Sequence, residues 1–431
     1  MTAPQRDTPR TTHAAALALE YGDQIIVRTV RDVHESLARR TFGYTRNIGG
    51  RVPEAIHNAM ARTMYDGLSA SARLSSKAMR SLGGRGVGKP IESTPRGRQV
   101  VSAINGLIGT ELLERGDPQA IMMSVRHDER DLPVDADTLA ATFTTPSGHL
   151  ALILHGLGEN DDSWRLRAEA TGSTYATRIA GEAGATPLLL RYNTGLHVSD
   201  NGARLAALIE TLCTNWPVPV TRISLIGHSM GGLVARAATN HGVAAGADWP
   251  GIVRNVVCLG TPHLGASLEK VVHLGSKALR LFPTASAFGR ILDTRSPGIV
   301  DLRHGYVTKD EWDGQDLTAK WGLNRIAAAP LPHAEYHFVA ATLGPTPGHP
   351  LSEMLGDLFV RFPSATGRGR SGDPIVGHAQ VQHLGSTDHF ALLNHPRVGD
   401  WLVSWLSAEP RELPATRSST EAHFEAPGGS A

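Results

Sequence analysis

The feature that most constrains this chain is a glycine–serine turn between an apolar strand and an apolar helix. Residues 222–233 read RISLIGHSMGGL, an apolar run followed by Gly-x-Ser-x-Gly and by apolar residues at helical spacing. In a strand-to-helix turn of this kind, Gly227 and Gly231 let strand and helix pass closely, and Ser229 adopts a strained backbone that exposes its hydroxyl. The pattern predicts that Ser229 is a nucleophile; the alternative is a glycine-rich turn with a capping serine.

Strand and helix patterns alternate on both sides of this turn. Such alternation predicts a mostly parallel sheet flanked by helices. Strands are expected at 150–154, 187–191, 223–226, 252–259, 335–342 and 379–384, with a helix at 163–183, another helix after the turn and a closing amphipathic helix that contains Val398 and Leu402. We divide the chain into a helical N-terminal region (1–140), an α/β domain (141–408) and a disordered tail (409–431).

The strand pattern stops between residues 265 and 330. Leu268, Val271, Val272 and Leu279 have the spacing of an amphipathic helix, and large hydrophobic residues are scattered through the polar remainder. A long insertion after a strand can cover the site below it, so we predict a lid-like insertion here.

Bulk properties exclude several classes of protein. The 431 residues carry a net charge of +1, which gives no electrostatic argument for nucleic acid or an anionic membrane. Two cysteines, both in apolar runs, do not form a disulfide framework. No secretory pattern and no apolar run of about 18 residues is present. We expect a cytoplasmic protein, at most peripheral to a membrane, and make no prediction of its oligomeric state.

The N-terminal region contains two patterns that could be over-interpreted. Ile56, Met60, Met64 and Leu68 recur every four residues, which predicts a helix face packed in a core. Alternating glycines precede Lys89, but no strand leads into them and Pro90 blocks a helix, so a phosphate-binding loop is not expected.

A serine nucleophile needs a base, and the order of the chain narrows the choice. In the fold that carries this turn, the acid and then the histidine follow the serine. His389 lies in a loop after the last predicted strand, with the terminal helix behind it, and is our predicted base. His383 falls within that strand and His395 begins the helix, so both are expected to pack or face solvent.

Two aspartates could orient the base. Asp357 and Asp373 both follow the strand that ends near Thr342, and either could hold the imidazole in the correct tautomer. Asp388, next to the histidine in sequence, would point away from it. A carboxylate that caps a turn is the alternative role for all three.

Two backbone N–H groups would complete such a site as an oxyanion hole. One is expected from Met230, directly after the nucleophile, and the other from Leu157, in the loop after the strand that ends at Leu154. His155 and His228 have no companion at metal-ligand spacing, so neither a metal nor a cofactor is expected.

These motifs together resemble a known family. The segments HGLG, GHSMGG, LGTPHLGA, GDLFVRFPSATG and DHFALLNHPRV look like those of the α/β-hydrolase lipases, especially the bacterial members close to the GPI inositol-deacylase group. The resemblance covers roughly residues 148–406 and implies the α/β-hydrolase fold.

The resemblance also bears on the acid. In those lipases the acid lies in Asp-Gly-Leu-Val, followed by Ser and then Gly, a spacing that Asp357, Val360, Ser364 and Gly367 reproduce. The resemblance therefore favours Asp357 over the alternative acid Asp373, although Leu358 stands where the family has glycine.

The function implied is hydrolysis of carboxylic esters, with a small molecule or a lipid as substrate. Ser229 would form the acyl-enzyme, His389 would move the proton, and Asp357 would orient His389. Two alternatives keep the same fold: an acyltransferase that passes the acyl group to an alcohol or thiol, and a binding protein without catalysis.

Overall fold

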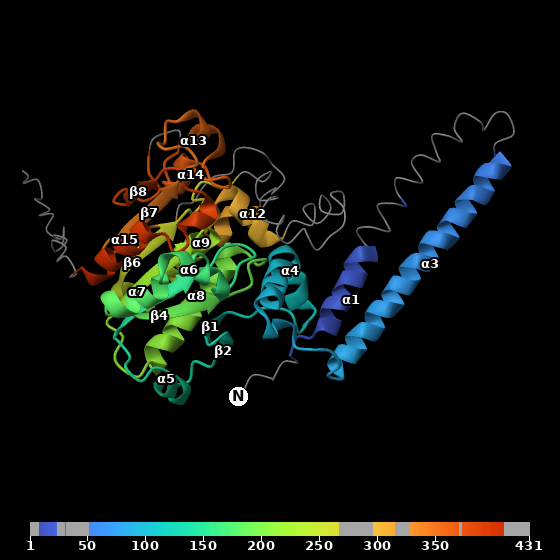
Figure 1. Ribbon diagram of the computed structural model, residues 1–431, viewed down its shortest axis with the longest axis horizontal. Helices are drawn as coiled ribbons and strands as arrows, with labels where there is room; N and C mark the ends of the chain where they lie inside the picture. Colours follow the sequence, from blue (N-terminus) through green and yellow to red (C-terminus); the bar gives the residue numbers. More distant parts are fainter. Residues whose placement is uncertain are drawn as a thin grey trace, which may run out of the picture.

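The computed structural model describes residues 8–23, 31, 51–266, 296–314, 328–369 and 373–408, with side chains of the long helix described from residue 57 onward. Of the predicted lid-like insertion it describes residues 265–266, 296–314 and 328–330. The helix expected around Leu268–Leu279 and the tail 409–431 lie outside the described residues. Figure 1 shows a central sheet with helices on both faces and a helical N-terminal region beside it.

The sheet has eight strands in the order β2-β1-β4-β3-β5-β6-β7-β8. All neighbours from β4 to β8 are parallel, and β1 and β2 are added to the β4 edge as antiparallel strands. The bounds are β1 Ser124–His127, β2 Arg130–Leu132, β3 His149–Leu154, β4 Thr186–Arg191, β5 Arg222–His228, β6 Val253–Leu259, β7 Glu335–Ala341 and β8 Gln380–Leu384. The six parallel strands coincide with the six predicted from the sequence.

The sheet starts earlier than predicted. β1 and β2 lie inside residues 1–140, the region that we describe from the sequence as helical. Their register pairs Val125 with Leu190 of β4, and Val125 is fully buried in the main core. A strand of three or four residues, rich in charge, has too few alternations to be recognised by periodicity.

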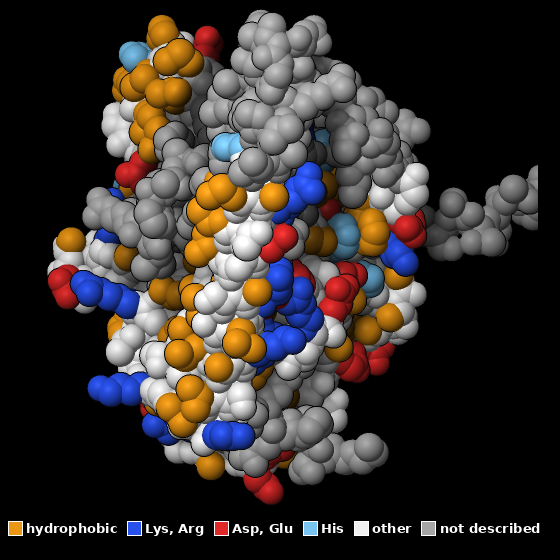
Figure 2. All heavy atoms as spheres, turned by 90° about the vertical axis from the view of Figure 1, so that its right-hand side faces the viewer, with side chains coloured by type: hydrophobic (Ala, Val, Ile, Leu, Met, Phe, Trp, Pro, Cys, Tyr) orange, Lys and Arg blue, Asp and Glu red, His pale blue; other side chains and the backbone are white. Residues whose placement is uncertain are grey.

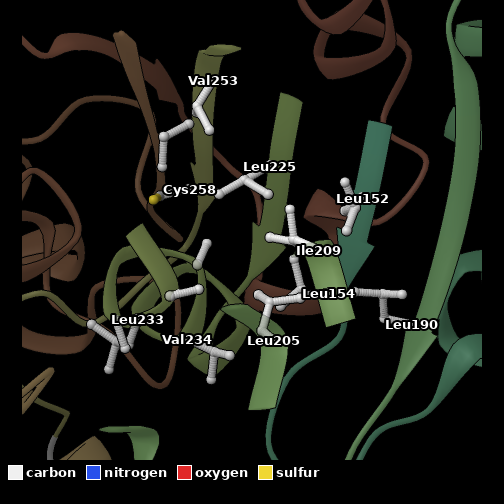
Figure 3. Close-up of a cluster of buried hydrophobic side chains, with 14 of the residues drawn as sticks. Leu152, Leu154, Leu190, Leu205, Ile209, Leu225, Leu233, Val234, Val253 and Cys258 are labelled. Atoms are coloured by element: carbon white, nitrogen blue, oxygen red, sulfur yellow. The ribbon is translucent and has the colours of Figure 1, made fainter. Parts of the chain in front are cut away.

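Both faces of the sheet are covered by helices, as a parallel sheet requires. Alternate residues of β3 pack into two separate hydrophobic cores, one on each face of the sheet. Leu152 and Leu154 face one core, and Ile153 faces the other. Helices α8 (Val198–Asn215) and α9 (Met230–Ala244) pack on the first face, and Figure 3 shows their side chains meeting those of β3 and β5. Helices α7 (Tyr175–Glu182) and α15 (Pro396–Ser407) cover the second face.

The helix predicted over residues 163–183 is interrupted. The structure has a 3-10 turn, η4 (Asp161–Arg165), a single turn α6 (Ala168–Thr171), and then α7. Gly172 ends α6 with a left-handed φ of 74°, and the Thr174 side chain caps the first turn of α7. Gly at such a C-terminal position and Thr at an N-cap are the common signals that separate two helices.

The N-terminal region contains α1 (Thr11–Gly22), α3 (Arg51–Gly84) and α4 (Pro95–Glu114). Helix α4 packs on the sheet domain, where Asn193 Nδ2 donates to the Gly109 carbonyl at 2.9 Å and Ser296 Oγ donates to the Gly106 carbonyl at 2.7 Å. Helices α1 and α3 pack against each other and extend away from the sheet (Figure 1).

One packing prediction for α3 is wrong in the described structure. Met60, Met64 and Leu68 are 69%, 51% and 51% exposed, whereas Ala61 and Tyr65 on another side of the helix are buried. The apolar spacing was real, but α3 presents a different face to α1. Figure 2, which views this side of the molecule, shows hydrophobic side chains spread over it.

Among the described residues, no helix has both the length and the apolar composition that crossing a membrane requires.

Candidate active site

Ser229 sits in the sharp turn that its sequence predicts. It joins β5 directly to α9 and has φ 52° and ψ −118°, a conformation that costs a non-glycine residue of order 1–3 kcal/mol. Its N–H donates to the Leu259 carbonyl of β6 at 2.8 Å, which holds the strained turn against the sheet. Neither of the two flanking positions has room for a side chain. A Cβ on Gly227 would overlap the backbone of Gly231, and a Cβ on Gly231 would overlap the Leu154 carbonyl.

The parallel strands bring the predicted site residues to one edge of the sheet. Ser229 follows β5, Asp357 comes after β7, and His389 comes after β8, while Leu157 lies in the loop that leaves β3. Since these strands are parallel, all four segments lie at the carboxyl ends of the strands, where open α/β sheets bind their ligands.

His389 and Asp357 form a buried pair. The Nδ1 atom of His389 lies 2.7 Å from Asp357 Oδ2, and both side chains are fully buried. The N–H of His389 also donates to the Asp357 carbonyl at 3.0 Å. The other carboxylate oxygen accepts the N–H groups of Phe359 and Val360 at 3.0 and 2.8 Å, so the carboxylate has a fixed orientation. A carboxylate at Nδ1 keeps that nitrogen protonated and leaves Nε2 as the basic atom.

The other two aspartates do not contact the imidazole. Asp373 is exposed, and it lies beside residues 370–372, which are outside the described residues. Asp388 Oδ1 accepts the N–H groups of Phe390 and Ala391, both at 3.0 Å, and caps the 3-10 turn η7 (His389–Leu392). Asp388 therefore has the turn-capping role that was the alternative for all three.

The electrostatic surroundings of His389 favour its protonated form. Burial alone would lower the pKa of His389, but the Asp357 carboxylate raises it above the usual value of 6.5, and Glu159 and Asp388 act in the same direction. A positive charge that develops on this imidazole is therefore stabilised.

The imidazole of His389 has no hydrogen bond to Ser229. His389 Nε2 is buried and has no hydrogen-bond partner among the described residues. The His389 ring lies 4.7 Å, centroid to centroid, from that of His228, the residue before the serine. In enzymes without substrate, such catalytic hydrogen bonds are often long and tighten only when substrate binds.

The two predicted oxyanion donors are in the first turn of α9 and in the loop after β3. Met230 is the first residue of α9, so its N–H has no partner within the helix. Across from it, a Cβ on Gly156 would come within 3.1 Å of Ser229 Cβ, which shows how closely the loop containing Leu157 approaches the serine. Helix α4 supports this loop, because Gln99 Nε2 donates to the Gly158 carbonyl at 2.8 Å.

The two histidines considered as metal ligands have other partners. His155 stacks on Tyr192 with ring centroids 4.4 Å apart, and His228 Nδ1 lies 3.1 Å from Glu159 Oε2. Neither belongs to a group of three or more potential metal ligands in the described part of the chain. Glu159 was not predicted from the sequence, since a single glutamate after the HGLG segment has no diagnostic spacing.

A comparison with known protein families matches the segment that contains the serine turn. Residues 193–314, which include β5, the Ser229 turn and β6, match the family model described as a PGAP1-like alpha/beta domain. The chain has the α/β-hydrolase fold. The predicted fold class and the predicted resemblance to α/β-hydrolase lipases and esterases are thereby confirmed. A search of curated proteins by sequence finds no match.

Solved structures of two esterases and a thioesterase domain are similar to about three fifths of this chain. An esterase from Thermogutta terrifontis is 13% identical with a TM-score of 0.35, covering 61% of this chain and 90% of its own. An esterase from Pyrococcus furiosus is 18% identical with a TM-score of 0.36, covering 60% and 83%. The NocB thioesterase domain is 13% identical with a TM-score of 0.34, covering 61% and 95%.

Proposed function

We propose that this α/β hydrolase is a serine esterase that cleaves carboxylic esters through an acyl-enzyme. The observation that carries the proposal is the buried 2.7 Å contact between His389 and Asp357, at the same sheet edge as the strained Ser229. A serine, a carboxylate and an imidazole in this order along the chain form the constellation for nucleophilic acyl transfer. The exposed position of Asp373 supports Asp357 as the acid.

In the first half-reaction, Nε2 of His389 removes the proton of Ser229, and the serine oxygen attacks the ester carbonyl carbon. The negative charge moves to the carbonyl oxygen, where the N–H groups of Met230 and Leu157 stabilise it. The imidazolium then gives its proton to the leaving alcohol as the ester C–O bond breaks, and the acyl group stays on Ser229.

In the second half-reaction, water takes the place of the alcohol. His389 accepts a proton from the water, the resulting hydroxide attacks the acyl carbon, and the imidazolium returns the proton to Ser229 as the acid leaves. These steps use the chain's own side chains and backbone. The proposed substrate is a small-molecule or lipid ester with an apolar acyl group, and the cytoplasmic location stays a prediction from the sequence.

The test is turnover of p-nitrophenyl acyl esters by the purified full chain and by Ser229→Ala. We expect release of nitrophenol by the wild type and a rate at the uncatalysed level for the variant. Folded wild-type protein without turnover on acyl chains from acetyl to palmitoyl would favour a binding protein. Repeating the assay with an added alcohol separates hydrolase from acyltransferase, because predominant formation of the new ester would contradict hydrolysis.

A further inference from the structure

A second buried carboxylate and imidazole lie beside the proposed triad. The Glu159 side chain, in the loop after β3, is only 6% exposed, and its Oε2 accepts the Gly156 N–H at 2.8 Å. The same oxygen lies 3.1 Å from Nδ1 of His228. The carboxylate thus joins the loop that carries the Leu157 N–H to the residue that precedes Ser229.

His228 continues this connection to the proposed base. It is fully buried at the end of β5, and its Nε2 lies 3.3 Å from the backbone carbonyl of His389. The rings of Trp164 and Phe390 each lie 6.3 Å from the His228 ring. Apolar rings on these sides leave the Glu159 carboxylate and the His389 carbonyl as the polar partners of the imidazole.

The partners of His228 determine how many protons the pair holds. A backbone carbonyl cannot donate, so Nε2 of His228 must carry a proton to bond to it. On the other side, a hydrogen bond between Nδ1 and the Glu159 carboxylate needs one more proton, whether that proton lies nearer the nitrogen or nearer the oxygen. A neutral imidazole facing an ionised carboxylate would leave one of these two contacts without a proton. Full satisfaction of the buried contacts therefore requires two protons on the pair.

We propose that Glu159 and His228 form a positioning pair for the esterase reaction, in which a shared proton ties the oxyanion loop to the backbone of His389. Neither side chain is assigned a contact with the reacting atoms. Glu159 holds Gly156, and thereby the orientation of Leu157, while His228 holds the main chain that carries the base. This inference rests on the proposed function.

The net charge of the pair bears on the base. His389 is faced by the carboxylates of Asp357, Glu159 and Asp388, which come from the segments after β7, β3 and β8, and by the ring of His228. Burial disfavours the charged form of His389, and all three carboxylates raise its pKa. With two protons the pair is neutral overall. Glu159→Gln removes the carboxylate charge together with the second proton, so the net charge beside His389 stays the same.

The first test compares kcat and KM of Glu159→Gln with those of the wild type. The glutamine is isosteric and can still accept the Gly156 N–H, but it cannot supply the charge that keeps a second proton on His228. We expect kcat to fall by about 10²-fold, as for a small misplacement of catalytic groups, with little change in KM. A Glu159→Gln variant with wild-type kcat would overturn the proposal.

Asp301→Asn is the matched control. Asp301 is also fully buried and also pairs with a histidine, with Oδ2 3.1 Å from His197 Nδ1, but this pair joins α12 (Pro297–His304) to the start of α8. Its loss should lower stability and leave kcat and KM near their wild-type values. If Asp301→Asn lowers kcat as much as Glu159→Gln, then the fall in kcat reports general loosening and the positioning role is contradicted.

The second test does not depend on activity. In ¹⁵N-histidine NMR of the full chain, with His228→Gln used to assign the signals, we expect at pH 7.5 a proton on Nε2 of His228 and a second proton in the hydrogen bond between its Nδ1 and Glu159. An Nδ1 signal typical of an unprotonated nitrogen without a hydrogen bond, in protein with or without esterase turnover, would overturn the proposal. Absence of esterase turnover together with both protons would instead contradict the proposed function while leaving the proton-sharing pair in place.

Discussion

The carboxylate of Asp357 lies 2.7 Å from Nδ1 of His389, and the carbonyl of the same aspartate accepts the N–H of that histidine at 3.0 Å. One residue therefore holds both the ring and the main chain of the proposed base. The double contact fixes the direction in which Nε2 points, because neither the backbone nor the ring can rotate without losing a buried hydrogen bond.

Asp357→Asn is expected to reduce turnover by about 10⁴-fold, because an amide at this position favours the wrong tautomer of the imidazole, as in the trypsin triad. Steady-state hydrolysis of a p-nitrophenyl ester measures the change. Asp373→Asn is the control and should keep nearly wild-type turnover, since Asp373 is exposed. The reverse ranking of the two variants would show that the wrong acid was chosen.

The pH dependence of kcat/KM should have an acidic limb above pH 6.5. The base must be neutral to accept a proton, and the neighbouring carboxylates outweigh burial and raise the pKa of His389 above its usual 6.5. Because the pKa of His389 is higher in the folded than in the unfolded protein, its protonation also stabilises the fold. This contribution to the free energy of unfolding is fully present below the unfolded pKa of 6.5 and is lost as the pH rises through the raised pKa of the folded state. Initial rates at low substrate concentration between pH 5 and 9 provide the measurement, and a limb centred below pH 6.5 would contradict the assigned electrostatics.

Leu358→Gly should stabilise the protein by about 1 kcal/mol. Leu358 has a φ of 92° in the turn that presents Asp357. Relief of strain of order 1–3 kcal/mol exceeds the entropy cost of glycine, roughly 0.5–1 kcal/mol. Urea unfolding measures the difference. Leu351→Gly, in helix α13 (Pro350–Leu355), is the control and should destabilise by about 1 kcal/mol. Equal losses in both variants would argue against strain at Leu358.

Gly231→Ala should destabilise by about 3 kcal/mol or more and abolish turnover, because the new methyl group would overlap the Leu154 carbonyl. Gly181→Ala is the matched control in helix α7, where nothing lies within 4 Å of the added Cβ, and it should gain about 0.5–1 kcal/mol. Thermal unfolding of the two variants gives the comparison. A stable and active Gly231→Ala would mean that strand and helix do not approach as closely as described.

The sequence contained most of the information for the sheet and the serine turn. Long apolar strands and the Gly-x-Ser-x-Gly segment are local patterns, and each predicts its own conformation. The choice between Asp357 and Asp373 could not be made from local patterns, because both aspartates have similar neighbours in sequence; only the resemblance to lipases favoured Asp357. Burial separates them, and burial is a property of the folded chain: Asp357 is fully buried and Asp373 is exposed.

Other features could not be predicted because they depend on long-range contacts. The Glu159 carboxylate pairs with His228, which is 69 positions away in sequence, and no local spacing indicates that pairing. Met60 and Met64 have the periodicity of a packed face, yet the face that α3 turns toward α1 is set by the partner helix. Periodicity shows that a helix is amphipathic and does not show what covers it.

The most direct test of the account is covalent labelling of the full chain with a fluorophosphonate, with the adduct located by peptide mass spectrometry. We predict one adduct, on Ser229, formed rapidly in the wild type, slowly in His389→Ala and not at all in Ser229→Ala. Folded wild-type protein that forms no adduct, or forms one on another residue at the same rate in Ser229→Ala, would contradict the proposal that Ser229 is the nucleophile.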